Sequence, residues 1–248
     1  MQERGPSAYI AEFVGTFALV LFITLAASLF VVAPTAQNPA PFIDFTAIGL
    51  VHTFALFILI QSLAVASGAH FNPAVTVALT ALRQISVPDA AIYVVTQLAG
   101  GLVGALVTRL LLSNFPGAEV VNYGAPAIGE RLDGAVGLGM LGEGLGTFFL
   151  VFVFVGVAVN PRATREWAGL AIGAALGLAL IAIGPLTGGS FNPARAFGPA
   201  LVSGEFGGAG DFLLAYVLAP VIGAVLAAVV NLYIAPGRRG EGGIGPVG

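Results

Sequence analysis

The polar tripeptide Asn-Pro-Ala occurs directly after a Phe at two places in this chain. The two copies comprise Asn72, Pro73 and Ala74, and Asn192, Pro193 and Ala194. Asn is a strong helix N-cap and Pro is favoured at the first helical position, so each copy predicts the start of a helix. Val75 follows the first copy and Arg195 follows the second. The second predicted helix therefore carries a charge in its first turn that the first one lacks.

The amino-acid composition indicates the environment in which these helices lie. Of the 248 residues, 58% are hydrophobic and only 8% are charged, whereas a soluble globular domain carries roughly 25% charged residues. We therefore expect the chain to lie in a lipid bilayer. The net charge of −3 gives no indication of nucleic-acid binding, and two His with no Cys do not favour a metal centre.

Six apolar stretches reach the length of about 20 residues that a membrane-spanning helix needs. They cover residues 10–32, 45–66, 89–112, 137–159, 167–186 and 212–235. With a cytoplasmic N-terminus, the inner segments hold Arg4, Arg83, Arg162, Arg165, Arg238 and Arg239, and the outer ones hold Arg131, Arg195 and, at a helix end, Arg109. This bias predicts that both termini are cytoplasmic. The tail 236–248 is predicted to be flexible.

The sequence repeats itself. Glu12, Gly15, Thr16 and Phe17 recur as Glu143, Gly146, Thr147 and Phe148, the stretch 67–74 recurs as 187–194, and Gly100 and Gly104 match Ala219 and Gly223. We interpret residues 1–248 as one domain made of two halves, about 1–113 and 135–248. Because each half has three spans, the second half enters the membrane from the opposite side, which makes an inverted repeat.

In an inverted repeat the two Asn-Pro-Ala helices enter from opposite faces. About 10 residues at 1.5 Å each span about 15 Å, roughly half of the hydrocarbon core, so their N-termini are expected to meet near its centre. Each N-terminus carries about +0.5 elementary charge, and two such ends repel cations while letting neutral molecules pass. A single copy of the tripeptide would be interpreted as an ordinary turn, but two copies at matched positions favour the paired helices.

These features together resemble the aquaporin (major intrinsic protein) family. The resemblance extends over nearly the whole chain and includes both tripeptides, the "ExxGTF" pattern in the first and fourth spans, and "SGAHFNPAVT". It implies an all-α membrane protein with six transmembrane helices and two re-entrant half-helices. It also implies a homotetramer with one pore in each subunit and no cofactor.

The resemblance also implies a selectivity filter. The aromatic/arginine filter of the family falls on His52, Leu180, Gly189 and Arg195. This set is similar to that of plant tonoplast (vacuolar) aquaporins, some of which also pass ammonia. Glycerol channels instead place Asp directly after the Arg that follows the second tripeptide, where this chain has Ala196. An alternative for His52 is a hydrogen bond to a neighbouring helix, but its spacing from the first tripeptide favours a position in the pore lining.

Two acidic residues and a second His complete the candidate site. Glu12 and Glu143 could be interpreted as an acid/base pair, but no nucleophile or metal cluster accompanies them. The resemblance implies instead that each Glu accepts hydrogen bonds from the backbone of one pore loop. We interpret His70, which precedes the first tripeptide, as structural rather than gating.

The sequence therefore predicts a passive water channel in the plasma membrane, not an enzyme, with a single-file pore that excludes protons and ions. One alternative is a broader channel for ammonia or other small neutral solutes, with glycerol less favoured. A remote alternative is an ion-coupled transporter, which would need titratable pairs along its path. The expected partners are water and lipid.

Overall fold

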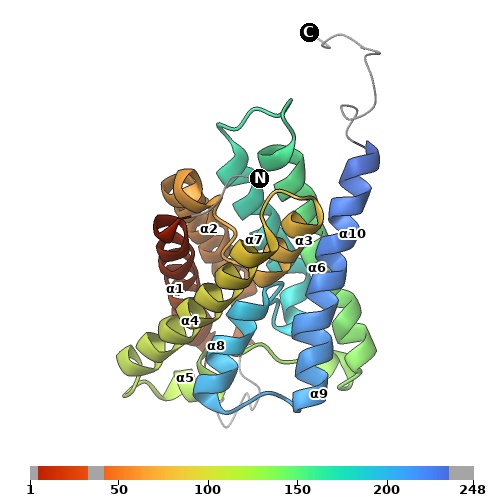
Figure 1. Cartoon of the computed structure of the whole chain (residues 1–248). Helices are drawn as coiled ribbons and strands as arrows, with labels where there is room; N and C mark the ends of the chain where they lie inside the picture. Colours follow the sequence, from red (N-terminus) through yellow and green to blue (C-terminus); the bar gives the residue numbers. More distant parts are fainter. Residues whose placement is uncertain (1–4, 33–41, 235–248) are drawn as a thin grey trace.

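The computed structural model describes residues 5–32 and 42–234, so the predicted flexible tail lies outside the described residues (Figure 1). Six helical segments in the described part are long and apolar enough to span a membrane. They are α1 (Pro6–Leu29), α2 (Phe45–Ser67), α4 (Val87–Leu111), α6 with a π-helical end (Val136–Val159), α7 (Ala168–Thr187), and α9 to α10 (Ala209–Ile234). The predicted all-helical fold with six spans is confirmed.

Two shorter helices begin at the Asn-Pro-Ala tripeptides. They are α3 (Pro73–Ala81) and α8 (Pro193–Ser203). Figure 1 shows α3 in the upper half of the bundle and α8 in the lower half. Each is too short to span the membrane, because its 9 or 11 residues rise only about 15 Å.

The remaining elements connect the long helices. A two-residue antiparallel pair, β1 (Val31–Val32) with β2 (Phe42–Ile43), precedes α2. The segment between α4 and α6 holds α5 (Pro116–Val120) and two short 3-10 turns (Asn122–Gly124 and Glu130–Leu132). The last span begins with α9 (Ala209–Phe212), passes through a π-helical stretch (Leu213–Leu218), and ends in α10 (Ala219–Ile234).

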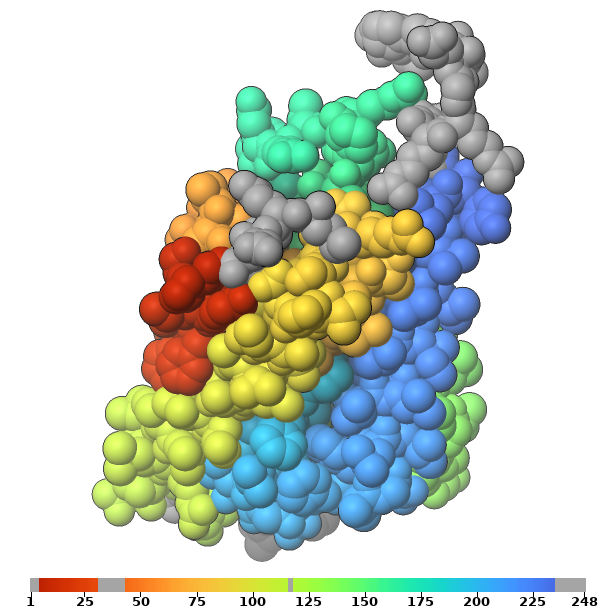
Figure 2. Space-filling model, in the orientation of Figure 1, coloured from red at the N-terminus to blue at the C-terminus, as the bar shows by residue number. Residues whose placement is uncertain are grey.

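The helix contacts occur in matched pairs. In the first half α1 packs on α2 and α4, and in the second half α6 packs on α7 and α10. The short helices cross over, because α8 packs on α4 while α3 packs on α10. The α2–α7 contact joins the two halves. Figure 2 shows α1, α4, α8 and α10 side by side on one face of the molecule.

The third and sixth spans are related in a different register from the one that their glycines suggest. A Cβ on Gly100 would lie 2.5 Å from the Phe13 carbonyl oxygen, and a Cβ on Gly223 would meet the carbonyl oxygen of Gly144, the repeat counterpart of Phe13. Gly100 therefore corresponds to Gly223, and the sequence match of Gly104 with Gly223 was wrong by one helical turn. Small residues recur every four positions along these helices, so the pattern fits both registers.

Two phenylalanines connect the spans to the loops that precede α3 and α8. Phe71 and Phe191 are fully buried, and their rings occupy the space that a Cβ on Gly15 and Gly146 would need. This contact explains the Gly of the repeated Gly-Thr-Phe pattern, because any larger residue would displace the ring and the loop with it.

We predict that Gly223→Ala destabilises the fold, whereas Gly137→Ala does not. The new methyl group at residue 223 would collide with the Gly144 carbonyl, but nothing lies within 4 Å of a Cβ at Gly137. Overpacking costs about 1–3 kcal/mol, while Ala instead of Gly in an open helix position gains about 0.5–1 kcal/mol. Thermal unfolding of both detergent-purified variants measures the difference, and equal melting temperatures would contradict the close contact.

Candidate functional site: a cavity between the two short helices

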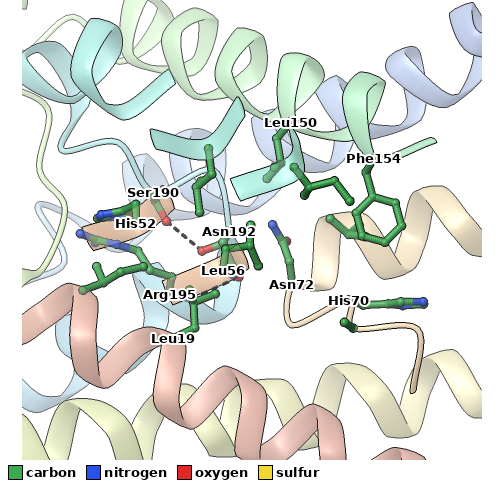
Figure 3. A pocket seen from close by; sticks show the side chains of 15 residues that line it. Leu19, His52, Leu56, His70, Asn72, Leu150, Phe154, Ser190, Asn192 and Arg195 are labelled. Carbon is green, nitrogen blue, oxygen red and sulfur yellow. Dashed lines mark hydrogen bonds between the residues drawn. The ribbon is translucent and has the colours of Figure 1, made fainter. Parts of the chain in front are cut away.

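A narrow cavity lies where the N-termini of α3 and α8 face each other (Figure 3). Leucine, isoleucine and phenylalanine side chains from α1, α2, α6 and α7 form much of its wall. The polar lining residues are His52, His70, Asn72, Ser190, Asn192 and Arg195. The volume open to the centres of water molecules is only about 20 Å³. In Figure 3, His52 and Arg195 lie together at one end of the cavity and His70 and Phe154 at the other.

The two asparagines join the halves at the middle of the cavity. The Oδ1 atoms of Asn72 and Asn192 each accept a hydrogen bond of 2.9 Å from the first turn of their own helix. Their Nδ2 atoms donate across the halves, from Asn72 to the Phe191 carbonyl and from Asn192 to the Phe71 carbonyl, both at 2.8 Å. An amide nitrogen carries two N–H groups, so the second one of each remains for a molecule in the cavity.

The loop before α3 is attached to the buried carboxylate of Glu12. Its Oε1 accepts hydrogen bonds from the Ser67 hydroxyl (2.6 Å) and the His70 backbone N–H (2.9 Å). Its Oε2 accepts from the Phe71 backbone N–H and the Gln97 side-chain amide, both at 2.7 Å. These donors supply the partners that a buried carboxylate requires.

Glu143 holds the loop before α8 in the same way. Its Oε1 accepts hydrogen bonds from the Thr187 hydroxyl (2.6 Å) and the Ser190 backbone N–H (3.0 Å), and its Oε2 accepts from the Phe191 N–H (2.6 Å). Glu12 and Glu143 therefore stand apart, each engaged with one loop. This arrangement does not suit an acid/base pair, which needs both groups beside one substrate.

Anchoring is needed because both loops have unusual backbone conformations. Phe71 and Phe191 have φ values of 47° and 53°, in the left-handed region that bulky residues rarely adopt. Such positions cost on the order of 1–3 kcal/mol each and persist only when the surroundings fix them. The carboxylate bonds to their backbone N–H groups provide that restraint.

The four residues that the family resemblance assigned to a filter fall into two pairs. His52 and Arg195 both line the cavity. Leu180 and Gly189 do not belong to its lining, and the Leu180 side chain fills the space beside the Gly189 Cα. His52 Nδ1 lies 2.8 Å from the Ile48 carbonyl oxygen of its own helix, so the alternative of a bond to a neighbouring helix does not apply to this nitrogen.

Several buried polar atoms at the His52 end have no hydrogen-bond partner among the described residues. They are His52 Nε2, Arg195 Nε and Arg195 Nη1. Unpartnered buried donors and acceptors are rare in folded proteins. Because both residues line the cavity, these atoms are candidates for hydrogen bonds with a molecule that occupies it.

His70 is held by a network that the sequence did not predict. Its Nδ1 lies 3.1 Å from the Thr76 hydroxyl, which also donates to the Asn72 carbonyl (3.1 Å) and accepts from Gln97 (3.0 Å). Gln97 in turn reaches Glu12. Sequence reasoning also missed Ser190, although its position as the repeat counterpart of His70 was the signal that could have found it.

Comparisons with known proteins agree with this architecture. The family model described as major intrinsic protein matches residues 4–231. Aquaporin AqpM of Methanothermobacter thermautotrophicus is 36% identical over 242 residues, covering 91% of this chain and 96% of that protein. Nodulin-26 of Glycine max is 40% identical over 221 residues (89% and 75%), and glycerol uptake facilitator protein-like 6 of Lactiplantibacillus plantarum is 36% identical over 222 residues (89% and 94%).

The fold also matches a solved structure. The X-ray structure of the aquaglyceroporin from Plasmodium falciparum superposes with a TM-score of 0.75 at 24% identity, covering 92% of this chain and 96% of that one. At this identity the likeness concerns the fold.

We predict that Glu143→Gln destabilises the protein and closes the cavity. Glutamine has one side-chain oxygen where the carboxylate has two, so at least one of the three donors would lose its acceptor. An unsatisfied buried donor costs about 1–3 kcal/mol. Thermal unfolding together with the water permeability of reconstituted vesicles measures both effects. The exposed Glu166 provides the control, and Glu166→Gln should change neither quantity.

Proposed function

This chain belongs to the major intrinsic protein family, and we propose that it conducts water passively in single file while excluding protons and other ions. Membership of the family makes it an integral membrane channel rather than an enzyme. The identity of the permeating molecule is the part that we propose.

The dimensions of the cavity carry the proposal for water. A water molecule needs roughly 10–15 Å³ of volume open to its centre, and the cavity offers about 20 Å³. Water molecules would therefore pass one behind another. The polar groups along one wall, including Asn72 and Asn192, would replace the hydrogen bonds that each molecule leaves behind in bulk water.

Charge supports the exclusion of cations. The positive N-terminal ends of α3 and α8 both face the cavity, and Arg195 adds a full positive charge in the first turn of α8. We propose that His52 and Arg195 form the filter, with Leu180 and Gly189 shaping it from behind. The similarity of these four residue types to the filter of plant tonoplast aquaporins is part of this proposal.

A second candidate is the passage of ammonia or another small neutral solute. The aliphatic Leu180 beside Gly189 favours this candidate, because neither of these two residues brings a polar or aromatic side chain to the filter. One relative is named a glycerol uptake facilitator protein, but the small cavity and Ala196 after Arg195 speak against glycerol here. An ion-coupled transporter is not favoured, since Glu12 and Glu143 both hold loops.

We further propose a homotetramer in the plasma membrane with both termini in the cytoplasm. The exposed apolar side chains of the long helices, such as those of Ile10, Phe54 and Leu226, suit contact with lipid or with other subunits. The uneven distribution of Arg between the two sides supports the orientation.

Stopped-flow light scattering on proteoliposomes tests the function. We expect rapid shrinkage in a gradient of impermeant osmolyte, no faster glycerol entry than in protein-free vesicles, and no added proton conductance with a pH-sensitive dye. Shrinkage at the rate of protein-free vesicles would contradict the water channel. Proton leakage that rises with the amount of protein would contradict the exclusion of ions.

Replacing Arg195 with the residue at the matching position of the first half tests the role of its charge. The matching residue is Val75, so the variant is Arg195→Val. Its filter would lose the positive charge, and we therefore expect the leakage of cations and protons to rise severalfold while water still passes. The exposed Arg165 provides the control, and Arg165→Val should leave leakage unchanged. Equal leakage of both variants would show that Arg195 does not exclude cations.

A further inference from the structure

Ser190 is a polar lining residue of the cavity to which the filter described above gives no role. It is 2% exposed and lies two positions before Asn192, as His70 lies before Asn72. Its hydroxyl donates a hydrogen bond of 2.8 Å to the Asn192 carbonyl. A carbonyl can only accept, so the hydroxyl proton is committed to this bond and the Ser190 oxygen faces other partners as an acceptor.

In the first half, a different residue donates the hydrogen bond to the Asn carbonyl. There the Asn72 carbonyl accepts from the hydroxyl of Thr76, which is not among the lining residues of the cavity. Ala196 occupies the position of Thr76 in the second half and has no hydroxyl. The second half therefore satisfies its Asn carbonyl with a hydroxyl that borders the cavity.

His52 presents a second acceptor. Because the Ile48 carbonyl can only accept, His52 Nδ1 must carry the proton of their 2.8 Å bond. In the neutral imidazole the other nitrogen, Nε2, then has a lone pair. This nitrogen has no partner among the described residues. The residue that matches His52 in the second half is the apolar Ile172, so the second half has no counterpart of this acceptor.

Arg195, in contrast, provides hydrogen-bond donors. Its Nε and Nη1 groups donate and never accept, and neither has a partner in the described part of the chain. The end of the cavity at His52 and Arg195 thus offers two acceptors, on Ser190 and His52, and two donors on Arg195. A water molecule has two O–H groups and two lone pairs, which match this set in number and kind.

We propose that Ser190 is a specificity-determining residue, which with His52 and Arg195 forms a filter that selects good hydrogen-bond donors, and hence water over ammonia. This inference rests on the proposed channel function. Ammonia accepts strongly through one lone pair, but its N–H groups donate only weakly. Hydrogen-bond acceptors in the filter therefore favour water more than ammonia. Because ammonia has a single lone pair, one of the two Arg195 donors stays unpaired when ammonia occupies the filter.

Ser190→Ala in the full chain, reconstituted in vesicles, tests this inference. Osmotic shrinkage measures water permeability, and an internal pH dye after an ammonium gradient measures ammonia permeability, each corrected for protein-free vesicles. We expect the ammonia-to-water permeability ratio to rise about two- to tenfold, the range expected for the loss of one ordinary hydrogen bond. Ser190→Thr keeps the hydroxyl and should retain the wild-type ratio. Ser62, exposed on α2, supplies the matched control Ser62→Ala, which should also retain it.

The ratio distinguishes a role in selection from a purely structural one. If Ser190 only supported the loop, Ser190→Ala would lower both permeabilities in proportion, and an unchanged ratio would overturn the inference. A lower ratio would also overturn it, because Ser190 would then serve ammonia. Failure of the wild-type protein to conduct water would instead contradict the proposed function, since that result does not involve Ser190.

Discussion

The structure depends on one constraint, the need to satisfy irregular backbone in the middle of a membrane. Lipid offers no hydrogen bonds, so every exposed N–H and carbonyl at that depth must find a partner within the protein. The two loops before α3 and α8 meet this requirement through Glu12 and Glu143, which accept the loop N–H groups. The short helices, their positive ends and the cavity between them all rest on these two carboxylates.

The two halves share the contacts that support the loops, but they differ in residues that border one end of the cavity. The carboxylate anchors, the buried Phe rings and the crossed Asn bonds occur in both halves with nearly the same distances. The residues that border one end of the cavity differ from their counterparts, since Arg195 replaces Val75 and His52 replaces Ile172. The two matched halves support the cavity in the same way, and the proposed filter lies at its one asymmetric end.

Much of the architecture could be predicted because it follows from composition and spacing. The low charge and the six apolar stretches indicate a membrane bundle, and each Phe-Asn-Pro-Ala stretch marks a helix start. The register of the third and sixth spans could not be predicted, because Gly100, Gly104 and Gly223 fit two alignments one turn apart. The contact of each glycine with a particular carbonyl distinguishes the two alignments.

The site was predictable for residues that stand out in apolar surroundings, such as His52, Arg195 and the two Glu. Ser190, Thr76 and Gln97 were missed because Ser, Thr and Gln are common and their roles depend on partners distant in the sequence, as with Gln97 and Glu12. The division of the filter also needed the structure, since spacing alone cannot show that Leu180 packs behind Gly189 instead of lining the cavity.

The crossed bonds between Asn72 and Phe191 and between Asn192 and Phe71 have a consequence for biosynthesis. A ribosome releases residue 72 long before residue 192. The Asn72 amide therefore lacks its acceptor, the Phe191 carbonyl, while the rest of the chain is being translated and inserted. Completion of the passage is therefore among the last events of maturation. A chain that ends before Phe191 can form neither of the two crossed bonds.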